Sequence, residues 1–260
     1  MARSSSADKY ETNVCVSFVA TFRATLEFFA KKDVVMLEYH PKPFPHWQRS
    51  DRHFNLISTE ARRVIRFEGN RFVVRVEGYS SLDPYYETLA LARRMCDIFN
   101  VADIFSTAFT LTKTHALPSR QESRKAFAKL FLSPLTQDWL PQDGATDYAM
   151  TLDRSKTVSP ELVEMKPALA PLRLRHQYQI GPSDYNEVGQ RFVEFTKGAD
   201  NESYRTPHVA PDFSILAALK ITLERKNQKH WTTPTALWHF HDWAQTEAQA
   251  AWDRIAGGLR

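Results

Sequence analysis

The sequence predicts an α+β fold, in which strands and helices are interspersed without forming βαβ units. Several β-rich runs alternate apolar and polar residues, as half-buried strands do. Two of these runs are separated by only two residues, which indicates a hairpin. Helical patterns with capping residues follow groups of strands, not single strands. We therefore expect two lobes of antiparallel strands packed by helices, with a long amphipathic helix at the C-terminal end.

The first expected lobe covers residues 1–132. Residues 14–22 alternate in the manner of a strand, and residues 23–32 have apolar positions at helical spacing. Residues 34–39 are rich in β-forming side chains and predict a second strand. Three prolines then predict a loop over residues 40–53, because proline interrupts regular structure.

The clearest local signal is the segment 64–76, in which two β-rich runs flank Gly69–Asn70. This spacing predicts a two-residue hairpin turn, with the glycine supplying a positive φ. Because strand side chains alternate between faces, we expect opposite faces for two sets of residues. These sets are Phe67, Phe72 and Val74 on one face, and Arg66, Arg71 and Arg75 on the other.

Two capped helices complete this lobe. Asp83 is placed to cap a helix with Pro84 at its first position, and a strand is expected at 104–112. Ser119 and Glu122 have the spacing of a capping box, which predicts the start of another helix.

Residues 133–171 are rich in proline, and we expect them to connect the lobes. The second lobe is expected to cover residues 172–260. Its predicted strands are 172–180, 192–197 and 215–224. A long helix with an apolar stripe is expected to begin at Pro234.

Composition excludes several classes of protein. Hydrophobic residues make up 43% and charged residues 25%, which are ordinary globular values. No apolar run is long enough to span a membrane, and residues 1–8 lack the apolar core of a signal peptide. Cys15 and Cys96 are too few for a disulfide framework or a zinc site. We expect free thiols and a cytoplasmic location.

Common catalytic signatures are missing. The sequence lacks the P-loop, the dinucleotide-binding glycine pattern, the zinc-hydrolase helix, the nucleophile elbow and the CxxC pair. Most nucleotide-binding and metal-hydrolase activities therefore lose support. We expect no cofactor and no metal, and favour a binding or assembly subunit over an enzyme.

The distribution of charge suggests where such a subunit binds. Residues 1–130 contain 20 Lys/Arg against 14 Asp/Glu, whereas residues 131–260 contain 14 against 16. A basic half can contact nucleic acid or an acidic protein, although solvated outer faces would give the same pattern. The candidate contact residues are Arg49, Arg52, Arg62, Arg63, Arg66, Arg71, Arg75, Arg120, Arg124 and Lys125.

The alternative function is phosphodiester cleavage. His46 and His53, with His40, could provide a base or bind a metal, but the same residues suit a proline-stiffened surface loop. A second set could hold Mg²⁺ in the manner of nuclease hairpins, although nearby prolines disfavour a central strand there. That set is Asp153, Glu164 and Lys166.

Aromatic residues gather in the predicted last helix. Tryptophans suit a protein–protein contact as well as a core, so this helix is a candidate docking surface for a protein partner or a second copy. Its candidate residues are Trp238, Trp243 and Trp252. On the same helix, His239 and Asp242 are neighbours at i, i+3, and His241 lies on the apolar stripe. Such pairs are usually structural contacts.

The order of elements resembles a sporadically distributed, poorly characterised bacterial α+β family, known mainly from automatic classification. The matching pieces are Asn70–Val74, Tyr85–Glu87, Leu172–Arg175 and the last helix with Trp238 and Trp243. The loop 40–53 departs from the family pattern. The resemblance implies no catalytic residues, and it implies a setting among mobile elements and antiphage defence or toxin–antitoxin-like cassettes.

Overall fold

The structure is a computed structural model of the whole chain. It describes residues 11–58, 61–79, 81–117, 119–132, 150–158, 172–183, 214–225 and 234–259. Strands and helices are interspersed along the chain, and the predicted α+β class is confirmed. Among the described helices, none is both long enough and apolar enough to cross a membrane.

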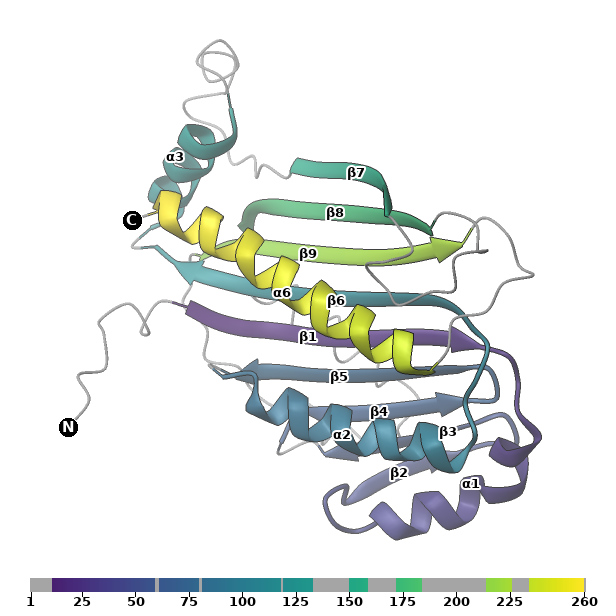
Figure 1. Cartoon of the computed structure of the whole chain (residues 1–260). Coiled ribbons are helices and arrows are strands. Elements are labelled where there is room, and N and C mark those ends of the chain that lie inside the picture. The colour runs from purple at the N-terminus through teal and green to yellow at the C-terminus, as the bar shows by residue number, and fades with distance from the viewer. Residues whose placement is uncertain are drawn as a thin grey trace, which may run out of the picture.

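In the part of the chain that the structure describes, nine strands form one sheet in which every pair of neighbours is antiparallel (Figure 1). Their order across the sheet is β2-β3-β4-β5-β1-β6-β9-β8-β7, so β1 and β6 lie near the middle and β2 lies at one edge. The strands are β1 (Glu11–Phe22), β2 (His46–Arg49), β3 (His53–Ser58), β4 (Arg63–Glu68), β5 (Arg71–Tyr79), β6 (Ile104–Ala116), β7 (Met150–Val158), β8 (Leu172–Ser183) and β9 (Ser214–Arg225).

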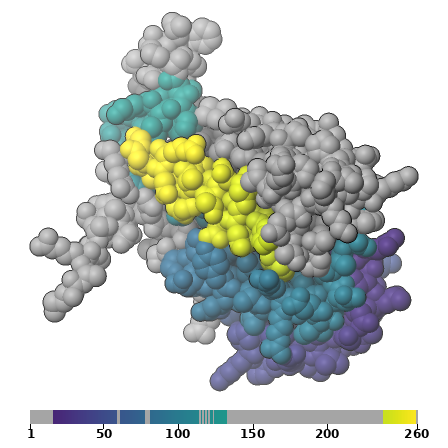
Figure 2. Space-filling view, in the orientation of Figure 1, coloured from purple at the N-terminus to yellow at the C-terminus, as the bar shows by residue number. Residues whose placement is uncertain are grey.

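Helices α2 and α6 cover one face of this sheet (Figure 1). Figure 2 shows the same covered face, with α6 in yellow next to the blue of the first half of the chain. Helix α1 lies beside the edge that β2 forms, and α3 lies near the C-terminal end of α6. The helices are α1 (Leu26–Tyr39), α2 (Asp83–Ile98), α3 (Arg120–Phe131) and α6 (Pro234–Leu259).

The two expected lobes share one sheet, because β1 pairs with β6 and β6 pairs with β9. Among the described residues, the first half runs strand, helix, four strands, helix, and the second half contains a strand, a helix, three strands and a helix in that order. The repeated order begins again at Ile104, ahead of the connector expected at 133–171. Within that connector the structure contains β7, a strand that the sequence did not indicate.

The core lies between the sheet and its helices. Alternation along β1 places Val16, Phe18, Ala20 and Phe22 in this core, as the sequence predicts. The ring of Trp238 on α6 lies 6.2 Å from that of Phe18 and 6.3 Å from that of Phe72. The last helix therefore completes a core that the first strand begins.

Residues 34–39, expected as a strand, continue helix α1. Thr25 caps this helix, since its hydroxyl accepts a hydrogen bond from the amide of Phe28 at 3.1 Å. Helical spacing buries one face of α1, through Phe28, Val35, Met36 and Tyr39. This tertiary burial outweighs the strand preference of Val34 and Val35.

The β4–β5 hairpin is confirmed, with Glu68 opposite Arg71 and two residues between them. The positive φ predicted for Gly69 is wrong, because the φ of this residue is not in the left-handed region. A Cβ at this position would lie only 2.9 Å from Cζ of Phe29. A side chain at position 69 would therefore require the ring of Phe29 to shift. The predicted loop 40–53 is also shorter than expected, because β2 forms at His46–Arg49.

Candidate anion-binding site at the turn end of the sheet

Several of the arginines predicted to bind an anion are neutralised inside the chain. Arg49 lies 3.3 Å from Asp33 of α1, and Arg75 pairs with Glu77. These ion pairs reduce the basic surface that the sequence suggested.

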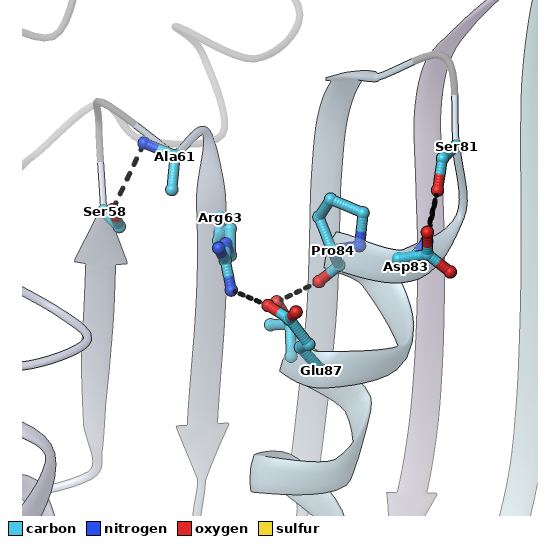
Figure 3. Close-up of polar contacts among 8 residues, drawn as sticks. Ser58, Ala61, Arg63, Ser81, Asp83, Pro84 and Glu87 are labelled. Carbon is cyan, nitrogen blue, oxygen red and sulfur yellow. Dashed lines mark hydrogen bonds and ion pairs between the residues drawn. The ribbon is translucent and has the colours of Figure 1, made fainter. Parts of the chain in front are cut away.

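Arg63 is also paired, on the covered face of the sheet. Its Nη1 donates to Oε2 of Glu87 in α2 at 2.9 Å, next to the first turn of that helix (Figure 3). There Ser81 accepts from the amide of Asp83, and the N-cap position is Leu82 and not Asp83. Arg63 therefore joins β4 to α2 and does not share a face with Arg66.

Arg66, Arg71 and Arg75 do share the sheet face that points away from the helices. The register pairs Arg66 with Val73, Arg71 with Glu68, and Arg75 with Val64. The alternate positions Phe67, Phe72 and Val74 are buried in the core. The opposite facing of these two sets is confirmed.

A hollow of about 450 Å³ lies at the end of the sheet where three turns meet. We call it the turn hollow. One side comes from the β4–β5 turn, one from the β2–β3 turn, one from the link between β1 and α1, and one from α1 itself. Its lining residues are Ala24, Phe29, Arg52, His53, Arg66, Glu68, Gly69 and Asn70.

Backbone hydrogen bonds tie these turns together. The amide of Gly69 donates to the carbonyl of Arg52 at 3.2 Å, and the amide of Phe22 donates to the carbonyl of Asn70 at 2.9 Å. Nζ of Lys32 on α1 donates to the carbonyls of Ser50 and Asp51, at 2.8 and 2.9 Å. The hollow therefore has a hydrogen-bonded frame made of segments that are far apart in the sequence.

Strand register arranges the polar residues beside the hollow in a row. His53 of β3 is opposite Glu68 of β4, Glu68 is opposite Arg71 of β5, and Arg71 is opposite Thr21 of β1. Directly opposite residues in an antiparallel sheet have Cβ atoms about 5 Å apart. Arg71, which is exposed, therefore stands immediately beside the hollow.

The charged groups at the turn hollow are several arginines and one carboxylate, that of Glu68. Nε of Arg66 lies 2.8 Å from Oε1 of Glu68, which leaves its two terminal nitrogens for another ligand. Arg52 and Arg71 are exposed, and neither has an ion pair with a carboxylate among the described residues. Two cations thus stand at the hollow without an acidic partner from the part of the chain that the structure describes.

His53 adds an imidazole whose pKa is lowered by its surroundings. Partial burial lowers the pKa of His53 below its usual value, and the nearby charges of Arg66 and Lys32 lower it further, against the opposing effect of Glu68. Its Nδ1 is 2.7 Å from Oγ of Ser50, whose oxygen also accepts from the amides of Arg52 and His53. The imidazole is therefore held in place by the β2–β3 turn.

Sequence reasoning found Arg52, His53 and Arg66 but missed Phe29. That ring is 48% exposed, although it stands on a helix whose other aromatic residues are buried. The only signal in the sequence was the glycine at the β4–β5 turn, and its meaning became clear only from the approach of Phe29 to Gly69.

The remaining basic candidates lie elsewhere. Arg62 is in the β3–β4 turn, at the end of β4 opposite the hollow, where its carbonyl accepts from the amide of Glu77. Arg120 begins α3, and Lys125 in that helix pairs with Glu122 at 3.1 Å. Arg124 lies in the same helix, which is far from α1 in the molecule (Figure 1).

The structure does not bring the three histidines of residues 40–53 together. His46 is opposite Ile57 and His53 is opposite Glu68, so they lie at opposite ends of the β2–β3 pair. The ring of His40 instead packs 6.2 Å from that of Trp47. No group of three metal-ligating side chains occurs among the described residues. Asp153 lies in β7, whereas Glu164 and Lys166 are outside the described residues.

The tryptophans of α6 are mostly used inside the chain. Trp238 is 7% exposed and Trp252 is 3% exposed, and Trp243 packs partly buried against the core. The sequence prediction of an exposed docking surface is therefore wrong for Trp238 and Trp252, because the helix turns these indoles towards the core.

The carboxylate of Asp242 binds His241 and not its predicted neighbour His239. Nδ1 of His241 lies 2.9 Å from Oδ1 of Asp242, and its Nε2 lies 2.8 Å from the hydroxyl of Tyr85 on α2. His241 is 1% exposed, and burial lowers its pKa while the hydrogen bond to Asp242 opposes that shift. The His241–Tyr85 hydrogen bond joins α6 to α2 and is buried, whereas the carboxylate of Asp242 is exposed, and this arrangement fits a structural contact.

Comparison with known proteins adds no constraint to this site. No protein-family model matches the chain, and no curated protein matches it either. The family resemblance noted from the sequence remains a prediction.

Proposed function

We propose that this protein is a non-catalytic binding subunit that contacts nucleic acid through the turn end of its sheet. The observation that supports the proposal is the convergence of Arg52, Arg66 and Arg71 around one hollow, while Arg49, Arg63 and Arg75 are neutralised elsewhere. Cations placed without acidic partners cost stability through mutual repulsion, and an anionic ligand would relieve that cost.

Nucleic acid fits this end of the molecule better than an acidic protein. The hollow combines arginines with the exposed ring of Phe29. Proteins that bind single strands without a sequence preference use this combination, because phosphates meet the cations and bases stack on aromatic rings. An acidic protein would use the cations and leave the ring without a role.

Catalysis has no comparable support. The histidines proposed for it are dispersed, and the described residues contain no metal-ligating cluster. A role in a bacterial defence or toxin–antitoxin-like assembly, which the family resemblance implies, would suit a binding subunit and is kept as part of the proposal.

The test is binding of a fluorescent single-stranded octanucleotide, measured by anisotropy between 50 and 300 mM NaCl. The double variant Arg52→Ala/Arg71→Ala should bind more weakly. The slope of log affinity against log salt should fall by about 1.4, because each phosphate contact to a single strand contributes about 0.7.

A charge-matched control separates a local site from net charge. Arg49→Ala/Arg94→Ala removes the same two charges from residues paired with Asp33 and Glu38. This control should keep the wild-type slope. Equal losses in both double variants would contradict the proposal. Displacement of the octanucleotide by poly-glutamate at equal charge concentration would favour an acidic protein instead.

A further inference from the structure

The turn hollow offers a platform for a flat ring next to a place for a phosphate. Phe29 is 48% exposed, and the tip of its ring stands over Gly69, where any Cβ would lie 2.9 Å from Cζ. The ring is held from behind by an edge-on contact with the buried Phe28, 5.3 Å between centroids. Phe28 therefore supports the ring on one side, while about half of the surface of Phe29 stays open.

The cations stand at a different side of the same hollow. Arg52 comes from the β2–β3 turn and Arg66 from β4. Because Glu68 engages Arg66 through Nε, the terminal nitrogens of that guanidinium remain for a second anion. Guanidinium groups suit phosphate well, since their paired N–H donors match two phosphate oxygens.

We propose that the turn hollow binds one nucleotide unit, with its base against Phe29 and its phosphate between Arg52 and Arg66. The volume of about 450 Å³ is within the usual range for small-molecule sites. This inference rests on the proposed function, and it narrows nucleic-acid binding to an unpaired nucleotide. The unit can belong to a strand or be a free mononucleotide, since both present the same base and phosphate.

The direct test is calorimetric titration of the full chain with three probes. Adenosine 5′-monophosphate carries both groups, ribose 5-phosphate lacks the base, and adenosine lacks the phosphate. We expect the complete nucleotide to bind at least about tenfold more tightly than either part, as each part loses a contact of 1.4 kcal/mol or more. Equal binding of the nucleotide and ribose 5-phosphate would overturn the inference.

Variants assign the base contact to one ring. Phe29→Ala should weaken binding of adenosine 5′-monophosphate about 5- to 150-fold, the range for loss of a base–aromatic stack. Tyr86→Ala is the matched control, because Tyr86 is 42% exposed and lies on α2, away from the hollow. Gly69→Ala should also weaken binding, because its methyl group pushes Phe29 from its place. Circular dichroism confirms that each variant is folded.

The octanucleotide separates the two sources and the two proposals. If the unit belongs to a strand, Phe29→Ala weakens the octanucleotide as much as the mononucleotide, and a duplex of the same sequence competes poorly. If the natural ligand is a free nucleotide, only the mononucleotide responds to Phe29→Ala. The inference would be overturned if the octanucleotide bound the control Arg49→Ala/Arg94→Ala with wild-type affinity and the mononucleotide did not bind at all. The proposed function would then still stand. Failure of the octanucleotide to bind, with tight mononucleotide binding, would do the reverse.

Discussion

The covered face and the turn end of this sheet each contain a partly or fully buried histidine, and the surroundings of the two differ. His241 lies on the covered face and His53 at the turn end. Burial is the main cause that lowers the pKa of both His241 and His53. Asp242 partly reverses the shift at His241, whereas Arg66 and Lys32 reinforce it at His53. A carboxylate and the hydroxyl of Tyr85 saturate the buried imidazole. The imidazole of His53 lies among the cations of the turn hollow, so pKa shifts in the same direction accompany different environments.

The largest expected difference between the two regions is in stability. Trp238→Ala should lower the free energy of unfolding by about 3–5 kcal/mol, because it empties a buried site between Phe18 and Phe72. Phe29→Ala, at the exposed hollow, should cost about 0.5 kcal/mol or less. Urea unfolding followed by circular dichroism measures both. Comparable losses would mean that Phe29 belongs to the core and would erase the contrast.

A smaller effect tests the contact between α2 and α6. Tyr85→Phe and His241→Phe each remove the 2.8 Å hydrogen bond between them. Their combined cost should differ from the sum of the single costs by about 0.5–3 kcal/mol, since residues in contact are coupled. Unfolding energies of the two single variants and the double variant give this value. Strict additivity would show that the hydrogen bond does not hold the helices together.

The smallest effect is the dependence of stability on pH. Both histidines have a lower pKa in the folded chain than the usual value of about 6.5. The unfolded chain then binds more protons, so stability is complete above about pH 6.5 and falls as the pH drops towards the folded-state values. His241→Phe should flatten this fall more than His53→Gln, because His241 is the more deeply buried. Thermal melts between pH 5 and 8 check the order.

The sequence predicted those features best that depend on residues close together in the chain. The β4–β5 hairpin, the Ser119 cap of α3 and the start of α6 depend on neighbours in the chain, and each was found at its expected place. The helical course of residues 34–39 was missed, because it depends on a buried face supplied by distant strands.

The site followed the same rule. Alternation along β4 and β5 was enough to place Arg66 and Arg71 on one face. It could not reveal that Arg63 meets Glu87, or that Phe29 leans over Gly69, because each contact joins separate elements. Counting charges along the chain therefore overestimated the basic surface.

The shared core of β1 and α6 has a consequence for how the protein is made. The ring of Phe18 is covered by Trp238, yet more than two hundred residues separate them in the chain. During synthesis the part of this apolar face that α6 covers, including Phe18, stays uncovered until residues 234–259 have left the ribosome. Contacts of such long range fold slowly and leave apolar surface open to aggregation in the meantime. The nascent chain should therefore depend on chaperones, and release of the last helix should mark the moment at which it becomes protease-resistant.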